Sequence, residues 1–134
     1  MSVIHDWNEH NRGVIKEFRA NGGKDGLLLL TTTGAKSGAT RVNPLNYTRD
    51  GEHIILIASK AASPTHPDWY HNLVANPEVI VEVGSEGFQA RASIAEGEER
   101  QRLFDQQSAQ MPFFAEYQKR TTRQIPVIIL ERIT

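Results

Sequence analysis

The sequence predicts a single, mainly β domain in which an antiparallel sheet curls into a small barrel with helices packed outside it. About six short runs rich in Leu, Ile, Val and Thr follow one another along the chain, separated by glycine-rich or turn-like segments. Three or four helical segments accompany them without the regular alternation of a doubly wound parallel sheet. A chain of 134 residues has room for one core and not for two, so residues 1–134 are expected to be one domain.

The N-terminal segment, residues 1–22, is expected to form an amphipathic helix. Its apolar side chains recur at helical spacing, and the pair Gly22-Gly23 ends it. The apolar positions are Trp7, Val14, Ile15 and Phe18. The barrel and the C-terminal helices then occupy residues 27–134.

Three β runs are expected next, at residues 27–33, 41–48 and 53–59. Asp50-Gly51 is a strong hairpin turn signal, so the second and third runs are expected to be antiparallel neighbours. Pro44 lies inside the second run. Because proline cannot donate to a sheet ladder, it predicts a sheet edge or a bulge there.

The second half of the chain is expected to contain a short helix that begins after Pro67, a hairpin, a charged helix interrupted at Pro112, and a last strand. The expected helices span residues 68–75, 96–107 and 113–120, and the expected strands span residues 79–83, 88–94 and 125–133.

The composition excludes several classes of protein. The chain has fifteen Lys and Arg residues and sixteen Asp and Glu residues, and the resulting net charge of −1 gives no support for nucleic-acid binding. The absence of cysteine excludes disulfides, thiolate nucleophiles and cysteine metal sites, and the five histidines lack metal-binding spacing, so no metal is expected. With no long apolar run and no signal-peptide pattern at the N-terminus, the expected location is the cytoplasm.

A glycine-rich turn at residues 34–41 is the first candidate site. Glycines free backbone N–H groups, and Lys36 and Arg41 add a point charge and a bidentate fork for a phosphate or carboxylates. The spacing is not that of a P-loop, and a strand follows instead of a helix. An ordinary solvated hairpin loop is the alternative.

The second candidate site is residues 58–73, where small residues join a strand end to a helix that carries Trp69 and Asn72. Small residues let a flat ring approach the backbone, an aromatic side chain can stack on it, and an amide can bind its edge. The alternative is that Trp69 and Leu73, four positions apart, are core residues. Further on, Met111, Phe114 and Tyr117 are spaced three apart, which predicts one helix face in the core or at a pocket wall.

These segments together closely resemble the deazaflavin-dependent nitroreductase family of actinobacteria. The resemblance rests on residues 33–38 with Arg41 and Pro44, on residues 58–60 and 67–77, and on the final strand with its Pro126. It implies a split β-barrel of the FMN-binding-like type and coenzyme F420 as cofactor. That coenzyme combines a planar 5-deazaflavin ring with a tail that carries a phosphate and several glutamates.

The resemblance also implies roles for individual residues. Lys36, Ser37 and Arg41 would bind the phosphate end with Lys60 as a further contact, and the backbone of residues 59–62 with Trp69 and Asn72 would surround the ring. The implied cofactor-binding set is Lys36, Ser37, Arg41, Pro44, Ala58, Ser59, Lys60, Ala61, Ala62, Trp69 and Asn72.

The implied reaction is hydride transfer from the reduced deazaflavin to a small-molecule acceptor. Tyr117 is the first candidate for a proton donor or substrate-orienting group, and Ser59 is the second. Met111, Phe114 and Tyr117 would line the substrate pocket. Tyrosines are usual on this helix in the nitroreductase branch, so Met111 and Phe114 favour an apolar acceptor such as a quinone, an enone or a lactone over a nitroaromatic compound.

The sequence is compatible with alternative functions. The same barrel could serve an FMN-dependent oxidase or reductase, or a carrier that binds the deazaflavin without turnover. The chain could be a monomer or a homodimer. Contact with the inner face of the plasma membrane is an option if the acceptor is a lipid-soluble quinone.

Overall fold

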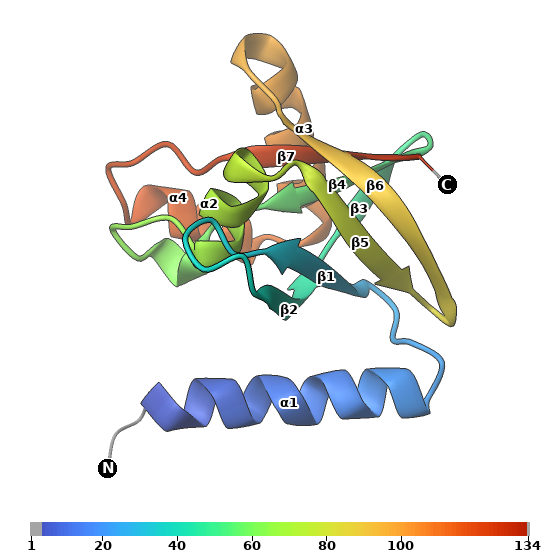
Figure 1. Ribbon diagram of the computed structural model, residues 1–134. Helices are drawn as coiled ribbons and strands as arrows, with labels where there is room; N and C mark the ends of the chain where they lie inside the picture. The colour runs from blue at the N-terminus through green and yellow to red at the C-terminus, as the bar shows by residue number, and fades with distance from the viewer. Residues whose placement is uncertain (1–3, 134) are drawn as a thin grey trace.

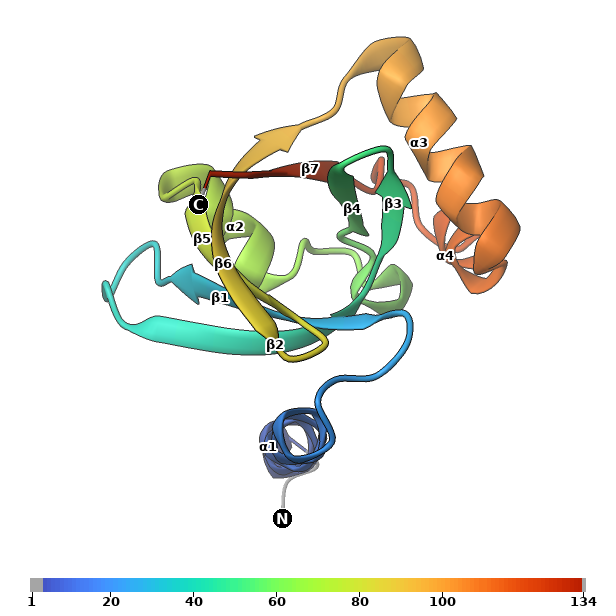
Figure 2. The same ribbon diagram turned by 90° about the vertical axis from the view of Figure 1, so that its right-hand side faces the viewer.

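The computed structural model describes the backbone of residues 4–133 and the side chains from His10 onward. Within that range seven antiparallel strands form one curled half-barrel sheet, accompanied by four α-helices and the short 3₁₀ helix η1 (Figures 1 and 2). The helices are α1 (Ile4–Ala20), η1 (Lys60–Ala62), α2 (Asp68–Ala75), α3 (Gly97–Gln110) and α4 (Phe113–Lys119). The strands are β1 (Leu27–Thr33), β2 (Thr40–Asn46), β3 (Thr48–Asp50), β4 (His53–Ile57), β5 (Glu78–Val83), β6 (Glu86–Ile94) and β7 (Val127–Arg132).

The strand order explains the curl. The sheet runs β2-β1-β5-β6-β7-β4-β3, so its two edge strands, β2 and β3, follow each other directly in the chain. The chain bends between them at Tyr47, whose backbone N–H donates to the Gly26 carbonyl at 3.2 Å. The expected single strand at residues 41–48 is therefore two strands, which raises the total from about six to seven. A residue that leaves both ladders in this way is not signalled by hydrophobic alternation.

The hairpin expected at residues 79–83 and 88–94 is confirmed, and Asp50-Gly51 does connect two antiparallel strands. The expected pairing of residues 41–46 with residues 53–59 is wrong, because residues 40–46 pair with β1 at the opposite edge of the sheet. β1 pairs with β2 and β5 pairs with β6, while Asp50 and Gly51 connect β3 to β4 as an antiparallel pair. Pro44 lies opposite Leu29 in the edge strand β2, which fits its missing N–H.

The core has two parts because side chains along each strand alternate between the faces of the sheet. In β4, Ile54 and Leu56 face the inside of the barrel, where α2 inserts Trp69 and Leu73. The other face of β4 packs against Phe114 of α4 and apolar residues of α3. Trp69 is only 6% exposed, so it belongs to the core in this structure.

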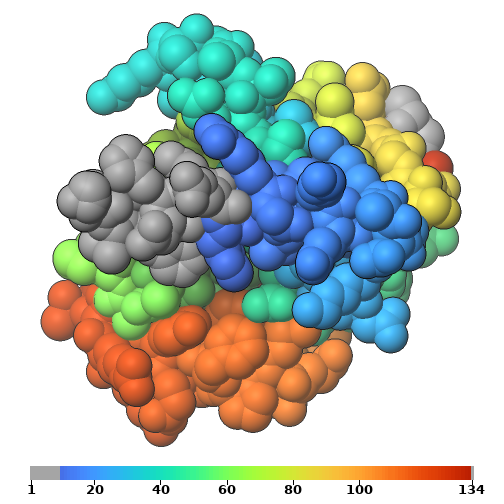
Figure 3. Space-filling view, turned by 90° about the horizontal axis from the view of Figure 1, so that it is seen from below, coloured from blue at the N-terminus to red at the C-terminus, as the bar shows by residue number. Residues whose placement is uncertain are grey.

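Helix α1 lies outside the barrel, alongside β2 (Figures 1 and 3). Its C-terminal end is well anchored: Phe18 is buried, and the Arg19 guanidinium binds the Glu82 carboxylate with Nη2 2.8 Å from Oε2. Gly23 has a positive φ of 103° and packs so closely that a side-chain carbon there would overlap the Cα of Gly84. The start of the expected helix at residues 1–3 and the Trp7 side chain lie outside the described part. No helix within residues 4–133 is long and apolar enough to cross a membrane.

Candidate functional site

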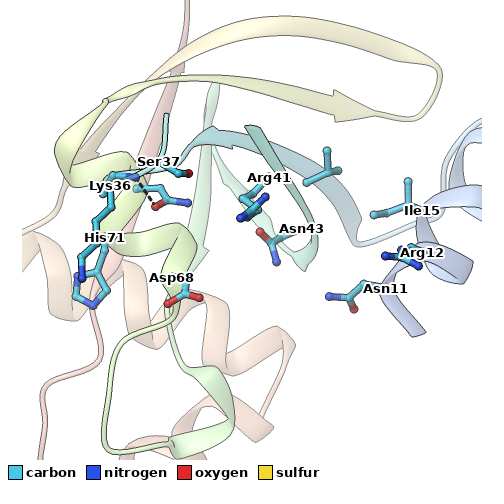
Figure 4. Close-up of a pocket in the computed structure, with 13 residues that line it drawn as sticks. Asn11, Arg12, Ile15, Lys36, Ser37, Arg41, Asn43, Asp68 and His71 are labelled. Carbon is cyan, nitrogen blue, oxygen red and sulfur yellow. Dashed lines mark hydrogen bonds between the residues drawn. The ribbon is translucent and has the colours of Figure 1, made fainter. Parts of the chain in front are cut away.

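A surface cavity of about 650 Å³ opens between α1, the β1–β2 connection and α2 (Figure 4). Its walls therefore come from three parts of the chain that are distant in sequence. The lining residues that carry polar or charged groups include Asn11 and Arg12 from α1, Lys36, Ser37 and Arg41 from the first hairpin, and Asp68, His71 and Asn72 from α2. Three of the predicted phosphate-binding residues and Asn72 are thus brought together in one cavity.

Residues 34–39, the glycine loop, form a compact turn between β1 and β2. The Gly34 N–H donates to the Ala39 carbonyl at 2.7 Å, and the Gly38 N–H donates to the Gly34 carbonyl at 3.0 Å. Gly38 has a φ of +74°, and a Cβ at Gly34 would lie only 3.0 Å from the Ala39 backbone carbonyl oxygen, as well as 2.8 Å from the Ser37 Oγ. Both glycines are therefore needed for the shape of the loop.

Asn72 joins this loop to α2. Its Oδ1 accepts the Ala35 N–H at 3.0 Å, and its Nδ2 donates to the Thr32 Oγ1 at 3.1 Å. Asn72 and Thr32 are both buried, at 7% and 1% exposure. The amide thus holds the loop against the barrel, and its expected contact with a cofactor ring stays a prediction.

The glycine loop also presents hydrogen-bond donors without partners. The backbone amides of Lys36 and Ser37 donate to no described residue, and the side chains of Lys36 and Arg41 are exposed and form no ion pair with any described residue. The Ser37 Oγ accepts the Ala39 N–H at 3.2 Å, which leaves its hydroxyl hydrogen for another acceptor. Two amides, a hydroxyl, an ammonium and a guanidinium make a donor set suited to a phosphate or carboxylate ligand.

Arg12 adds a third cation to this cavity, and sequence reasoning missed it. The described lining residues include three cationic side chains, those of Arg12, Lys36 and Arg41, and a single carboxylate, that of Asp68 (Figure 4). Arg12 lies on α1, and no local pattern indicates which face of that helix meets the glycine loop. Its place depends on the anchoring of α1 at Gly23 and Gly84.

A second unusual segment is η1, where three consecutive non-glycine residues have left-handed backbone angles. The φ values are 46° at Lys60, 49° at Ala61 and 66° at Ala62, and we call these residues the left-handed turn. Such a conformation costs an L-residue about 1–2 kcal/mol and persists only where its surroundings hold it. Ser59, just before the turn, is buried, whereas Lys60 and Ala61 are exposed.

Arg123, which sequence reasoning also missed, binds the backbone on both sides of the left-handed turn. It donates to the Ala58, Ser59 and Ser63 carbonyls, and its Nη1 lies 2.9 Å from the His66 Nδ1. Arginine has no lone pair to offer, so this His66 nitrogen accepts and the imidazole is neutral. Burial first, then the charge of Arg123 and the nearby His71, lower the pKa of His66 below its ordinary 6.5.

Helix α4 lies against η1, and it carries two of the expected substrate-pocket residues. Phe114 is buried in the core, at 4% exposure, and Tyr117 is half-buried. Met111 lies in the break between α3 and α4, not on the helix that carries the other two. Phe113 is 40% exposed, and its ring centroid lies 5.7 Å from that of Tyr117, which makes it an exposed aromatic side chain beside this region.

The predicted site residues thus form two neighbouring groups. Lys36, Ser37, Arg41 and Asn72 line the cavity. Ala58, the left-handed turn and Tyr117 do not line it, and the turn lies against α4, the helix that carries Tyr117. Trp69 lies in the core of the barrel, and Pro44 lies in the edge strand β2.

Fold and site together define a class: a split-barrel protein with a groove for an anionic small molecule next to an unusual backbone turn. Residues 4–132 match the model of the F420H(2)-dependent quinone reductase family, and the chain belongs to that family.

Individual relatives agree with this assignment. The chain is 39% identical over 110 residues to an F420H(2)-dependent quinone reductase of Mycobacterium tuberculosis, covering 78% of this chain and 72% of the relative. A solved F420-H2 dependent reductase is 42% identical, with a TM-score of 0.74 and coverage of 80% of this chain and 95% of that one. A structure described as a domain-swapped dimer is 38% identical, with a TM-score of 0.76 over 95% of this chain and 98% of that one. The expected split-barrel fold and the F420-dependent class are confirmed.

Proposed function

We propose that this chain reduces a quinone with a hydride from reduced coenzyme F420. The observation that carries the proposal is the donor set of the glycine loop within a chain of this family. When bound, the coenzyme would supply the hydride from its reduced deazaflavin ring. The residues of the chain would bind its tail, support its ring, exclude water and provide a proton.

The acidic tail fits the cavity at the glycine loop. Arg41 offers a planar fork, Lys36 a mobile ammonium, and Ser37 a hydroxyl, next to two unpartnered amides. Arg12 approaches the same cavity from α1 and would meet carboxylates further along the tail. The glycine loop and α1 would therefore bind the tail from both sides.

The ring end fits the left-handed turn. Ala61 is exposed there and Ala58 and Ser59 lie directly before the turn, so small side chains leave space for a flat ring to approach the backbone. Trp69 is buried beneath this region and would support the ring site through the core. Lys60, whose Nζ lies 3.4 Å from the Thr65 Oγ1, could release this contact to reach the cofactor.

The acceptor would lie on the apolar surface of α4 beside the turn. Reduction of a quinone to a hydroquinone takes up one hydride and one proton, so the protein must deliver a proton as well as position the acceptor. Tyr117 is the first candidate for that proton, and Ser59 is the second. Phe113 would contribute an exposed aromatic wall for a flat, apolar acceptor.

Anaerobic titration with the reduced coenzyme, followed by addition of menadione, tests the proposed function. We expect saturable binding and coenzyme oxidation well above the uncatalysed rate. Absence of binding would contradict the proposal, binding without turnover would indicate a carrier, and tight binding of FMN with a yellow protein as purified would favour the FMN alternative.

Tyr117→Phe should lower the turnover rate about tenfold or more while leaving coenzyme affinity unchanged, if its phenol donates the proton.

Location and assembly form a separate part of the proposal. We place the reaction in the cytoplasm, with peripheral contact at the membrane where a lipid-soluble quinone is the acceptor. The related structure described as a domain-swapped dimer makes exchange of a segment between two copies the first arrangement to test. Light scattering of the pure protein and co-sedimentation with anionic vesicles would examine the two points.

A further inference from the structure

Arg123 holds both ends of the left-handed turn with one side chain. Its Nη1 donates to the Ala58 carbonyl at 3.1 Å and its Nη2 to the Ser59 carbonyl at 2.5 Å, both just before the turn. Its Nε donates to the carbonyl of Ser63, just after the turn, at 2.8 Å. The three left-handed residues therefore lie between carbonyls that are bound to the same planar group.

This arrangement requires a guanidinium. Three nitrogens in one plane reach three carbonyls that face different directions, whereas a lysine ammonium is a single point. Arg123 forms no ion pair with any described carboxylate, so its bonds go to the backbone and to His66. A side chain selected for charge pairing alone would not be placed in this way.

Arg123 is itself fixed from the C-terminal helix and from His66. The Gln118 Nε2 donates to the Arg123 carbonyl at 2.9 Å, and the Gln118 Oε1 accepts the Ile125 N–H at 2.9 Å. On the side-chain end, neutral His66 accepts from the guanidinium, and the Tyr70 ring packs on the imidazole at 4.7 Å between centroids. The turn is thus coupled to α4 and α2, the two helices that border the proposed ring and acceptor sites.

We propose that Arg123 is a positioning residue that keeps residues 60–62 in the left-handed shape that receives the cofactor ring. This inference rests on the proposed function, because the turn matters for catalysis only if the ring binds there. The hold of Arg123 on the turn is a property of the protein without cofactor and can be measured separately.

The test compares Arg123→Lys and Arg123→Gln with a matched control, Arg91→Lys, at an exposed ion pair with Glu78 on the barrel. Hydrogen exchange of the cofactor-free protein is followed at the amides of Ala62 and Ser63, which donate to the Ser59 and Lys60 carbonyls at 3.1 and 3.0 Å. Both Arg123 variants should lower the protection of these two amides about tenfold or more, with β5 and β6 amides unchanged. The control should change neither set.

Coenzyme binding is measured on the same proteins. We expect Kd to rise about tenfold in Arg123→Lys and to stay at the wild-type value in Arg91→Lys. Unchanged protection at Ala62 and Ser63, or an equal loss across the sheet, would overturn the inference. Loss of protection at these amides with an unchanged coenzyme Kd would show that Arg123 holds the turn without positioning it for the coenzyme, and would overturn the inference too. If the wild-type protein binds no coenzyme, the proposed function fails and the positioning role fails with it, while the exchange data still report the hold on the turn.

Discussion

The glycine loop and the left-handed turn both contain residues with positive φ, but the two segments are stabilised in different ways. Both are short connections that need positive φ angles, and both are tied to the barrel by one side chain from elsewhere in the chain. The loop obtains its positive φ from Gly38, without strain, and leaves Lys36 and Arg41 free for a ligand. The turn has no glycine, so its conformation depends on Arg123, which is distant in sequence.

The difference indicates two kinds of pocket wall. A glycine-built loop keeps its shape whatever its exposed side chains are, so those side chains are available for charge recognition. A turn built from alanines needs outside support, but in return it presents a backbone with small side chains to a flat ligand. Substitutions at the loop should therefore change affinity through lost contacts, whereas substitutions at the turn should act through its shape.

The largest expected effect is at the glycine loop. Replacing both Lys36 and Arg41 with alanine removes two charged donors, and since such bonds contribute about 1.5 kcal/mol or more each, coenzyme Kd should rise about a hundredfold. Isothermal titration measures this. Lys24→Ala with Arg91→Ala removes the same formal charge from exposed positions outside the cavity and should leave affinity within about threefold. Equal losses in the two double variants would mean that total charge, not the loop, attracts the tail.

A smaller effect is expected where the loop is tied to α2. Asn72→Ala leaves the buried Thr32 hydroxyl without its partner and frees the Ala35 amide, so the free energy of unfolding should fall by about 2 kcal/mol. Urea denaturation measures it. Asn76→Ala is a matched control, because its Nδ2 makes only a long, 3.4 Å bond to the Thr33 carbonyl, and it should cost less than about 1 kcal/mol. A larger loss at Asn76 than at Asn72 would contradict the bridging role.

Much of the fold could be predicted because its signals are local. Asp50-Gly51 and Pro44 each act within a few residues, and the structure has the hairpin and the edge strand where they indicated. The break at Tyr47 could not be predicted, because it exists only once the sheet curls and the chain passes from one edge strand to the other. Val42, Leu45, Tyr47 and Thr48 are all residue types found in strands, so the local sequence gives no sign of the break.

The candidate site likewise has a part that the local sequence predicts and a part that only the tertiary structure reveals. Lys36, Ser37 and Arg41 lie within a few residues of two glycines, so a sequence pattern was enough to group them. Arg12 and Arg123 reach the site through tertiary packing, and neither is close to a pattern that indicates it. Trp69 shows the opposite case: its spacing from Leu73 allowed both a core and a ligand role, and burial supports the core role.

The smallest expected effect is a pH dependence of amide protection, which we expect at the left-handed turn and not at the glycine loop. The charged or titratable groups near His66 are Arg123, which precedes β7, and Tyr70 and His71 of α2. Lys60 is linked to this region because its Nζ donates to the Oγ1 of Thr65, the residue before His66. Its pKa is lowered in the folded protein, so the stability it contributes is full above its ordinary value near 6.5 and is lost as pH falls through the lower, folded value. Acidification should therefore reduce protection of the Ala62 and Ser63 amides, because imidazolium cannot accept from Arg123.

His66→Asn tests this directly, since an amide oxygen can take the place of Nδ1 and does not titrate. Protection factors, corrected for the intrinsic effect of pH on exchange, should fall on acidification in the wild-type protein and stay level in the variant, a difference worth about 1 kcal/mol or less. The Gly34 and Gly38 amides of the glycine loop should show no such dependence, because their acceptors are backbone carbonyls. A parallel fall at both segments would mean that the barrel loosens as a whole and that His66 has no particular link to the turn.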